Sequence, residues 1–278
     1  MWKSQVELLK GMTPPLRPHF SEVALVSEVV AELAKTIGGS DFRVLLLGLT
    51  QEIVQMGWPS KTRLTAVDRS EAMIRQFWPG DIPGERTLVN SDWRDMPFEK
   101  PSFHLIVGDG VLNFQPFPGG FRAFLDDLLP YLHPGGQLCA RVFTQLEAPE
   151  TTASLMDEFR RSDKVNYYEF RYRYATSLQE TAGDGFDGTK ETLDRSFESF
   201  GIPLSALYSK SGFTPPDVPA LKPGDPDECH RVYYPTEAEF MQACPPGFRL
   251  LRKLTGSHNL ASRTPIFVLQ RNDSLEQA

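Results

Sequence analysis

The stretch FRVLLLGLTQEIVQMGWPSKTRLTAVD, residues 42–68, decides the fold of this chain. It contains two short apolar runs, 42–48 and 64–68, whose length and β-branched content predict buried strands. The first run ends in Gly48 and the second in Asp68, twenty residues later. In a parallel sheet both residues would lie at the carboxyl edge, where such sheets bind their ligands.

Strands and helices continue to alternate after this stretch. Residues 86–90, 103–109 and 137–143 are predicted strands, while apolar residues at helical spacing predict one helix after Ser70 and another over 121–132. Short links between alternating elements require right-handed crossovers and a parallel sheet that is covered on both faces. We therefore predict a doubly wound α/β fold.

The segments on either side extend this core. A helix is predicted over 21–37, with Ser21 as its N-cap, after a proline-rich arm over 13–19 that cannot be helical. From about 146 to 235 the pattern changes to helical stretches, roughly 151–179 and 190–207.

The mixed basic and aromatic segment 160–174 fits both the helical and the strand period of side-chain spacing, and we favour a helix because of the flanking sequence. Two functions are open for it: a lid whose aromatic and arginine side chains hold an acidic or aromatic substrate, or a packing helix with snorkelling arginines. A further helix, capped by Thr236, leads into 248–254 and 264–269, which are predicted to pair as an antiparallel edge.

The predicted organisation is an arm and helix (1–40), an α/β core (41–145), a helical insertion (146–235), and a last helix with antiparallel strands that complete the sheet (236–278). A chain of 278 residues suits one such domain with a sizeable insertion.

Composition excludes several classes of protein. The net charge of −7 argues against broad, sequence-independent binding of nucleic acid, which needs a basic surface. Neither a signal peptide nor a bilayer-spanning run is present, so we expect a cytoplasmic protein that does not enter a membrane. Three scattered cysteines indicate reduced thiols, and five histidines without a ligand-like spacing give no reason to expect a metal.

Four segments together resemble the pattern of the class I S-adenosylmethionine-dependent methyltransferases. In that family a glycine turn follows the first strand, an acid closes the second, another acid follows the third, and a Pro-Gly-Gly turn precedes the fifth. The counterparts here are VLLLG (44–48), AVD (66–68), SDWRDMP (91–97) and LPYLHPGG (129–136). The resemblance covers about residues 40–145 and 236–271, and it implies a seven-stranded, mostly parallel sheet that binds S-adenosylmethionine.

The resemblance also implies roles for individual residues at the strand ends. A carboxylate at Asp68 suits the two adjacent hydroxyls of a ribose, and Gly48 lets the backbone approach the methionine tail closely. Asp92 is the counterpart of the acid that accepts the adenine amine, and Trp93 can pack on the adenine ring. The other predicted cofactor-binding residues are Leu49, Thr50, Arg69, Met73, Asp109 and Gly110.

The glycine turn departs from the family pattern. Leu46 stands where the family has an acid, and Thr50 and Glu52 stand where it has further glycines. S-adenosylmethionine has no pyrophosphate, so the turn need not cradle phosphates, and Glu52 is a candidate for the missing carboxylate.

The predicted reaction is methyl transfer to a small or medium acceptor, held beneath a helical cap formed by about 146–235. Asp109, Asn113 and His19 are the candidate catalytic residues by location. Two alternatives remain open: a non-catalytic module that senses a ligand or binds a protein, and a nicotinamide-dependent dehydrogenase. The dehydrogenase requires a G-x-G-x-x-G turn, which residues 48–53 lack.

Overall fold

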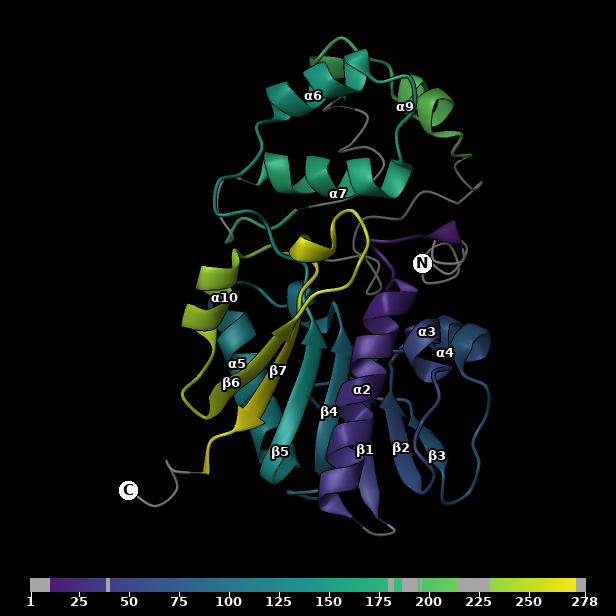
Figure 1. Cartoon of the computed structure of the whole chain (residues 1–278), viewed down its shortest axis with the longest axis vertical. Helices are drawn as coiled ribbons and strands as arrows, with labels where there is room; N and C mark the ends of the chain where they lie inside the picture. Colours follow the sequence, from purple (N-terminus) through teal and green to yellow (C-terminus); the bar gives the residue numbers. More distant parts are fainter. Residues whose placement is uncertain are drawn as a thin grey trace.

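The centre of the molecule is one sheet of seven strands (Figure 1). This computed structural model describes residues 11–38, 41–179, 183–186, 195, 197–214 and 231–273. In chain order the strands are β1 (Phe42–Leu47), β2 (Thr62–Val67), β3 (Arg86–Val89), β4 (Phe103–Asp109), β5 (Leu132–Arg141), β6 (Phe248–Leu254) and β7 (Ile266–Arg271). Their order in the sheet is β3-β2-β1-β4-β5-β7-β6. Neighbours among β1 to β5 pair in parallel, whereas β7 is antiparallel to both β5 and β6. The predicted doubly wound, mostly parallel, seven-stranded sheet with an antiparallel edge is confirmed.

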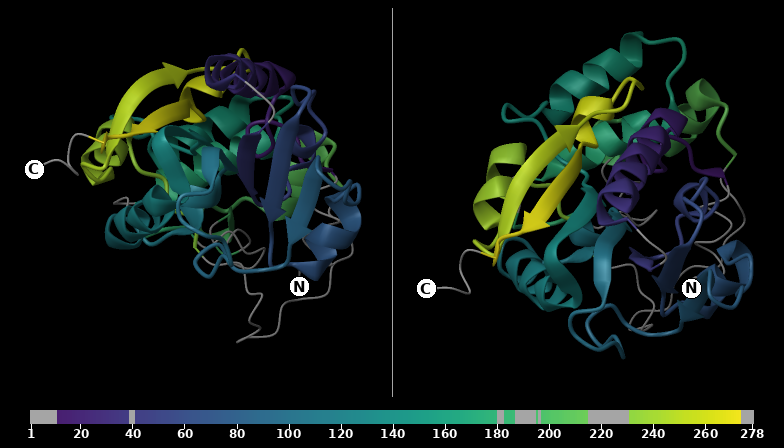
Figure 2. Two further views of the ribbon diagram at one scale, coloured as in Figure 1. Left: turned by 90° about the horizontal axis from the view of Figure 1, so that it is seen from below. Right: turned by 60° about the horizontal axis from the view of Figure 1, so that its bottom comes forward.

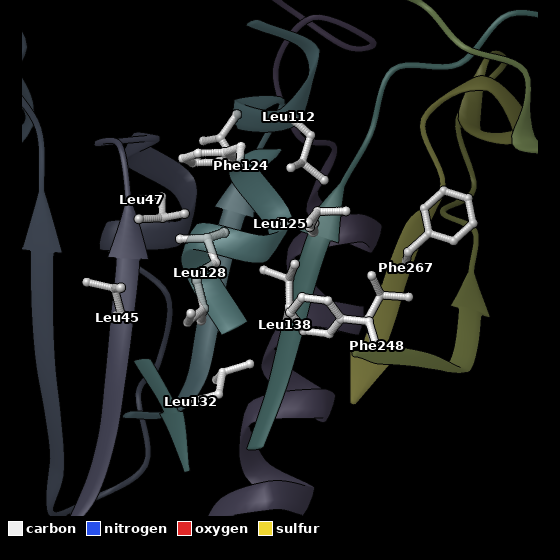
Figure 3. Close-up of a cluster of buried hydrophobic side chains, with 14 of the residues drawn as sticks. Leu45, Leu47, Leu112, Phe124, Leu125, Leu128, Leu132, Leu138, Phe248 and Phe267 are labelled. Carbon is white, nitrogen blue, oxygen red and sulfur yellow. The ribbon is translucent and has the colours of Figure 1, made fainter. Parts of the chain in front are cut away.

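Helices cover both faces of the sheet, as the two views of Figure 2 show. One face carries α2 (Phe20–Ile37), α3 (Gln51–Val54) and α4 (Glu71–Phe77), and the other carries α5 (Gly119–Leu128) and α10 (Glu237–Ala243). Successive side chains of a strand point to opposite faces. Val44 and Leu46 therefore pack with α2, whereas Leu45 and Leu47 join the cluster around α5 (Figure 3). Two hydrophobic cores, one on each face, hold the strand ends in place.

Several predicted boundaries need correction. His19, not Ser21, is the N-cap of α2: its side chain accepts from the Ser21 amide, while the Glu22 side chain accepts from the His19 amide at 2.7 Å. The helix predicted over 121–132 begins at Gly119 and ends at Leu128, after which a 3₁₀ turn follows. β5 begins five residues earlier than predicted, because its first residues continue directly from that turn.

Three further helices lie beyond the carboxyl ends of β1 to β5 (Figure 1), and we call them the upper helices: α6 (Thr152–Arg161), α7 (Tyr167–Leu178) and α9 (Leu204–Ser211). The single helix predicted over 151–179 is two helices, because residues 162–166 leave the helical path and Asn166 caps α7. Of the helix predicted over 190–207, residues 195 and 197–199 are helical and α9 begins only at Leu204; residues 190–194 and 196 lie outside the described part.

The helix favoured for the segment 160–174 is confirmed for its aromatic part, Tyr167–Tyr174, which lies in α7, but not for residues 162–166; the aromatic rings are buried among the upper helices. Tyr172 and Tyr174 are fully buried, and the Tyr167 ring stacks on Phe213 at a centroid distance of 3.7 Å. Among the described residues, no helix combines the length and apolarity needed to cross a membrane.

Candidate functional site

The turn after β1 and the loop after β3 meet at the carboxyl edge of the sheet. Gly48 has a φ of 79°, a left-handed conformation that favours glycine, and its amide donates to the Val67 carbonyl at 2.9 Å. The Trp93 indole donates to the same carbonyl at 3.0 Å. A Cβ at position 48 would lie 3.4 Å from the Trp93 ring. Two predicted cofactor-binding residues, Gly48 and Trp93, are thus in contact.

Asp68 lies directly beyond β2 and is buried, with 7% of its surface exposed. Its Oδ1 accepts from the Ser70 amide at 2.7 Å. Burial raises the pKa of Asp68 to about 6, although the Ser70 and Leu49 amides and the Arg69 charge act to lower it. A buried carboxylate with so few partners is poised to accept further hydrogen bonds.

Asp92 and Arg69 form the outer rim of this edge. They are joined by an ion pair of 2.9 Å in which both side chains are about half exposed. Asp92 also accepts from the Arg94 amide at 3.0 Å. Met73, in contrast, is a buried residue of α4 and belongs to the hydrophobic core on the α2 face.

Asp109, at the end of β4, is enclosed by two partners. Its Oδ1 lies 2.5 Å from Nη1 of Arg141, and its Oδ2 accepts from the Thr50 hydroxyl at 2.9 Å. The turn after β1 and the end of β4 are therefore linked through a carboxylate. Two predicted residues, Thr50 and Asp109, are brought together, and the charge of Asp109 is balanced.

Arg141 is the centre of a buried network that the sequence did not reveal. Its side chain is 1% exposed, and its Nε donates to Glu22, which is fully buried, at 3.0 Å. Its Nη2 donates to the carbonyls of Pro15 and Arg17, which belong to the arm before α2. Burial by itself would lower the pKa of Arg141, but Asp109 and Glu22 raise it.

Glu22 is held as a carboxylate within this network. Burial alone would raise its pKa, but hydrogen bonds from His258, the Arg141 charge, the His19 amide and the Thr264 hydroxyl bring it down to about 2. Glu22 therefore ties α2 to the end of β5 and to the connection between β6 and β7.

Gly110 and Asn113 lie next to the carboxyl edge of the sheet and contact the segments around it. Gly110 has a φ of 65°, and a Cβ there would lie 2.9 Å from the Phe143 ring. The buried Asn113 side chain donates to the carbonyls of Phe143 and Tyr233, and it accepts from the Phe143 amide at 2.9 Å. All its polar atoms are engaged with backbone, so its observed contacts hold segments together.

The partners of His19 and Glu52 lie at the start of α2 and in the arm before it. The Nδ1 of His19 lies 2.8 Å from the Ser21 hydroxyl, beside the start of α2. Glu52, the candidate for the missing carboxylate, forms an ion pair of 2.6 Å with Arg17 of the arm.

The sequence contains weak signals of the two network residues that its analysis did not identify. Arg141 interrupts the apolar run 138–143 at the end of β5, and Glu22 stands three residues after His19, the spacing of a capping box. A charged residue in an otherwise apolar strand requires a buried partner, but the sequence does not say which residue supplies it.

A groove of about 410 Å³ lies at the opposite, amino edge of the sheet. It is lined by the second half of α2, the start of β5 and the side chains of His104, Arg252 and Gln270. Arg252 is already paired with Glu32 at 2.8 Å across this groove. Among the described residues, no group of three or more His, Cys, Asp or Glu side chains is arranged to hold a metal ion.

No protein-family model and no curated protein matches the chain. Solved structures do match. An N-methyltransferase from Bradyrhizobium japonicum, in complex with S-adenosylhomocysteine, is 12% identical with a TM-score of 0.47, over 97% of this chain and 98% of the other. A magnesium protoporphyrin IX methyltransferase from Synechocystis, also with bound S-adenosylhomocysteine, is 14% identical with a TM-score of 0.47, over 96% and 93%.

A third match is a Burkholderia thailandensis 1,6-didemethyltoxoflavin N1-methyltransferase, bound to its acceptor and to S-adenosylhomocysteine. It is 14% identical with a TM-score of 0.46, over 91% of this chain and 81% of the other. Identities and TM-scores this low do not carry an argument about function, so we base the proposed function on the residues at the carboxyl edge.

Proposed function

We propose that this chain binds S-adenosylmethionine at the carboxyl edge of its sheet and transfers the methyl group to a small or medium acceptor. The observation that carries the proposal is the buried Asp68 beside the Gly48 turn. A carboxylate has about four lone-pair sites, of which the Ser70 and Leu49 amides take two. The remaining two suit the adjacent hydroxyls of a ribose.

The neighbouring residues fit the rest of a nucleoside. Gly48 has no side chain, so a ligand could approach its backbone beside the Trp93 ring, and the Trp93 indole offers an apolar face for a purine ring. Asp92, on the exposed rim, would accept the hydrogen bond of an adenine amine. Thr50 and Asp109 would lie toward the amino-acid tail.

When bound, the cofactor supplies a methyl group that its sulfonium makes electrophilic. The chain would bind the nucleoside, align the acceptor in line and exclude water. In this proposal the upper helices form a cap over the acceptor, because they lie beyond the strand ends on which the site is built (Figure 1).

Calorimetric titration with S-adenosylhomocysteine tests the binding site. Asp68→Asn keeps the shape of the side chain but removes its charge and half of its acceptors. Hydrogen bonds to a charged group contribute about 1.5–3 kcal/mol, so we expect roughly 10- to 100-fold weaker binding. Asp126→Asn, on the exposed side of α5, is the matched control and should bind as the wild type does. Equal affinities for all three proteins would contradict the proposal.

A specific observation favours the alternative of a non-catalytic module. Leu46 stands where the family has an acid, and Asp109 already has Arg141 and Thr50 as partners. The methionine end of the ligand would then have few free polar groups to meet. Incubation with methyl-labelled S-adenosylmethionine and a small-molecule cell extract separates the two functions: an enzyme produces labelled metabolites, whereas a sensor binds the ligand and labels nothing.

A further inference from the structure

His258 lies in the connection between β6 and β7, at the same edge of the sheet as the candidate site. Its side chain is 7% exposed, and its Nε2 is 3.3 Å from Oε1 of Glu22 and 3.3 Å from the Thr264 hydroxyl. None of the roles proposed above uses this histidine.

The hydrogen bonds around His258 fix the position of its proton. Glu22 is ionised and cannot donate, since its pKa is about 2. The Thr264 hydroxyl donates to Glu22 at 2.7 Å, so its only proton is committed there. Nε2 must therefore carry the proton, and Nδ1 of the neutral ring presents a lone pair.

That lone pair is buried and unused. Nδ1 of His258 is shielded from solvent, and among the residues that the structure describes it has no hydrogen-bond partner. A buried acceptor without a partner is costly and rare, and it calls for a bound group that can donate to it. A histidine oriented by a carboxylate, with its second nitrogen free, is the arrangement of a general base.

His258 lies between the core and the upper helices. The next residue, Asn259, donates to Glu169 of α7 at 3.2 Å, and the connection runs directly beneath α7 (Figure 1). Through Glu22 and Arg141, His258 is linked to Asp109 at the end of β4. An acceptor held beneath the upper helices would lie within this region.

We propose that His258 is the general base of the reaction and that the methyl acceptor carries an N–H or O–H group. This inference rests on the proposed function. As the acceptor's electron pair forms the bond to the methyl carbon, the C–S pair stays on sulfur and the acceptor's proton passes to Nδ1. The positive charge that leaves the sulfonium thus appears on the imidazolium, where the Glu22 carboxylate stabilises it.

The charged groups nearest the ring come from two elements. Glu22 of α2 contacts Nε2 through Oε1, and Arg141 of β5 contacts the same oxygen. The His19 ring of the arm lies 5.6 Å away between centroids, and Glu169 of α7 contacts the neighbouring Asn259.

The test compares His258→Gln with the wild type. The glutamine amide can still donate to Glu22 but has no basic nitrogen. His133→Gln, in the first turn of β5 at the amino edge, is the matched control. Rates are measured with methyl-labelled S-adenosylmethionine and a small-molecule cell extract, and S-adenosylhomocysteine affinity is measured by calorimetry.

Loss of a general base lowers the rate by about 10²- to 10⁴-fold. We expect that loss in His258→Gln only, with S-adenosylhomocysteine affinity unchanged and label on nitrogen or oxygen of the product. A variant as fast as the wild type, or label on a sulfur or on a quaternary nitrogen of the product, would overturn the inference and leave the proposed function standing. A wild-type chain that neither binds S-adenosylhomocysteine nor labels any metabolite overturns both.

Nitrogen-15 spectra of the histidine rings give a readout that needs no turnover. In the ligand-free protein, with an uncharged imidazole ring, the His258 signals should show a protonated Nε2 and an unprotonated Nδ1. A proton on Nδ1 would refute the assignment.

Discussion

Replacement of Arg141 by methionine tests the buried network directly. Methionine matches the arginine side chain as far as Nε, so the change keeps the apolar stem and removes the charged guanidinium group. It leaves Glu22 and Asp109 as carboxylates that are 0% and 8% exposed and have lost their shared cation. Removal of one partner from a buried ion pair costs about 3–5 kcal/mol of unfolding free energy. Here two buried carboxylates lose their cation, so we expect a loss at the upper end of that range.

The measurement is urea unfolding at neutral pH, followed by circular dichroism. Arg252→Met is the matched control: Arg252 also pairs with a glutamate, at 2.8 Å, but both partners are more than a third exposed. Such a pair contributes less than about 1 kcal/mol. Adding Glu22→Gln to Arg141→Met removes one of the two buried charges that have lost their cation. The double variant should therefore recover part of the lost stability, because the two residues are energetically coupled.

Equal losses for Arg141→Met and Arg252→Met would refute the reasoning. That result would mean that water reaches Glu22 and Asp109 in the folded protein and that the network is not buried in solution. The arm gives an independent check, since its Pro15 and Arg17 carbonyls are bound by Arg141. Limited proteolysis within the arm should accelerate in Arg141→Met and not in the control.

Three further predictions concern other residues. The pKa of Asp68 is about 6, and only its carboxylate can accept two hydroxyl groups, so S-adenosylhomocysteine affinity should rise as pH increases through 6; calorimetry across pH should give a flat profile for Asp68→Asn, and a flat wild-type profile would contradict this. Gly48→Ala forces a side chain into a φ of 79° next to Trp93 and should cost about 1–2 kcal/mol in urea unfolding. Gly57→Ala, where nothing lies within 4 Å of the new Cβ, is its control, and a similar cost at both positions would argue against strain at Gly48. Glu22 has a pKa lowered from 4.5 to about 2, so its contribution to stability is fully present above pH 4.5 and is lost as the pH falls toward 2. The difference in unfolding free energy between wild type and Glu22→Gln should shrink over that window, and a difference independent of pH would be inconsistent with an ionised, buried Glu22.

The sheet was predictable because burial is periodic. The predicted bounds of β4 and β6 match the structure, since each begins and ends where apolar spacing does. The antiparallel pairing of β6 with β7 was predicted as well. The helix ends were predicted less accurately. The N-cap of α2 depends on hydrogen bonds within a capping box of His19 and Glu22, which a pattern of apolar residues does not reveal.

The site was predictable only as far as strand ends define it. Gly48 and Asp68 directly follow strands and Asp109 is the last residue of one, so the rule for parallel sheets places all three at one edge. The partners of Asp109 were not predictable, because Arg141 lies elsewhere in the chain and its neighbours are apolar. Ion pairs between distant segments depend on how elements pack, which local spacing does not encode.

The bonds that seat α2 have a consequence for biosynthesis. Glu22 precedes its partner Arg141 by 119 residues and its partner Thr264 by 242. A ribosome adds about 5–20 residues per second, so the nascent helix waits roughly 10–50 s before Thr264 has even been added. During that interval β7 has not yet been synthesised, so the valine-rich face of α2 cannot pack against it. We therefore expect chaperones that hold apolar segments to bind the emerging chain here, and release to follow completion of the final strand pair.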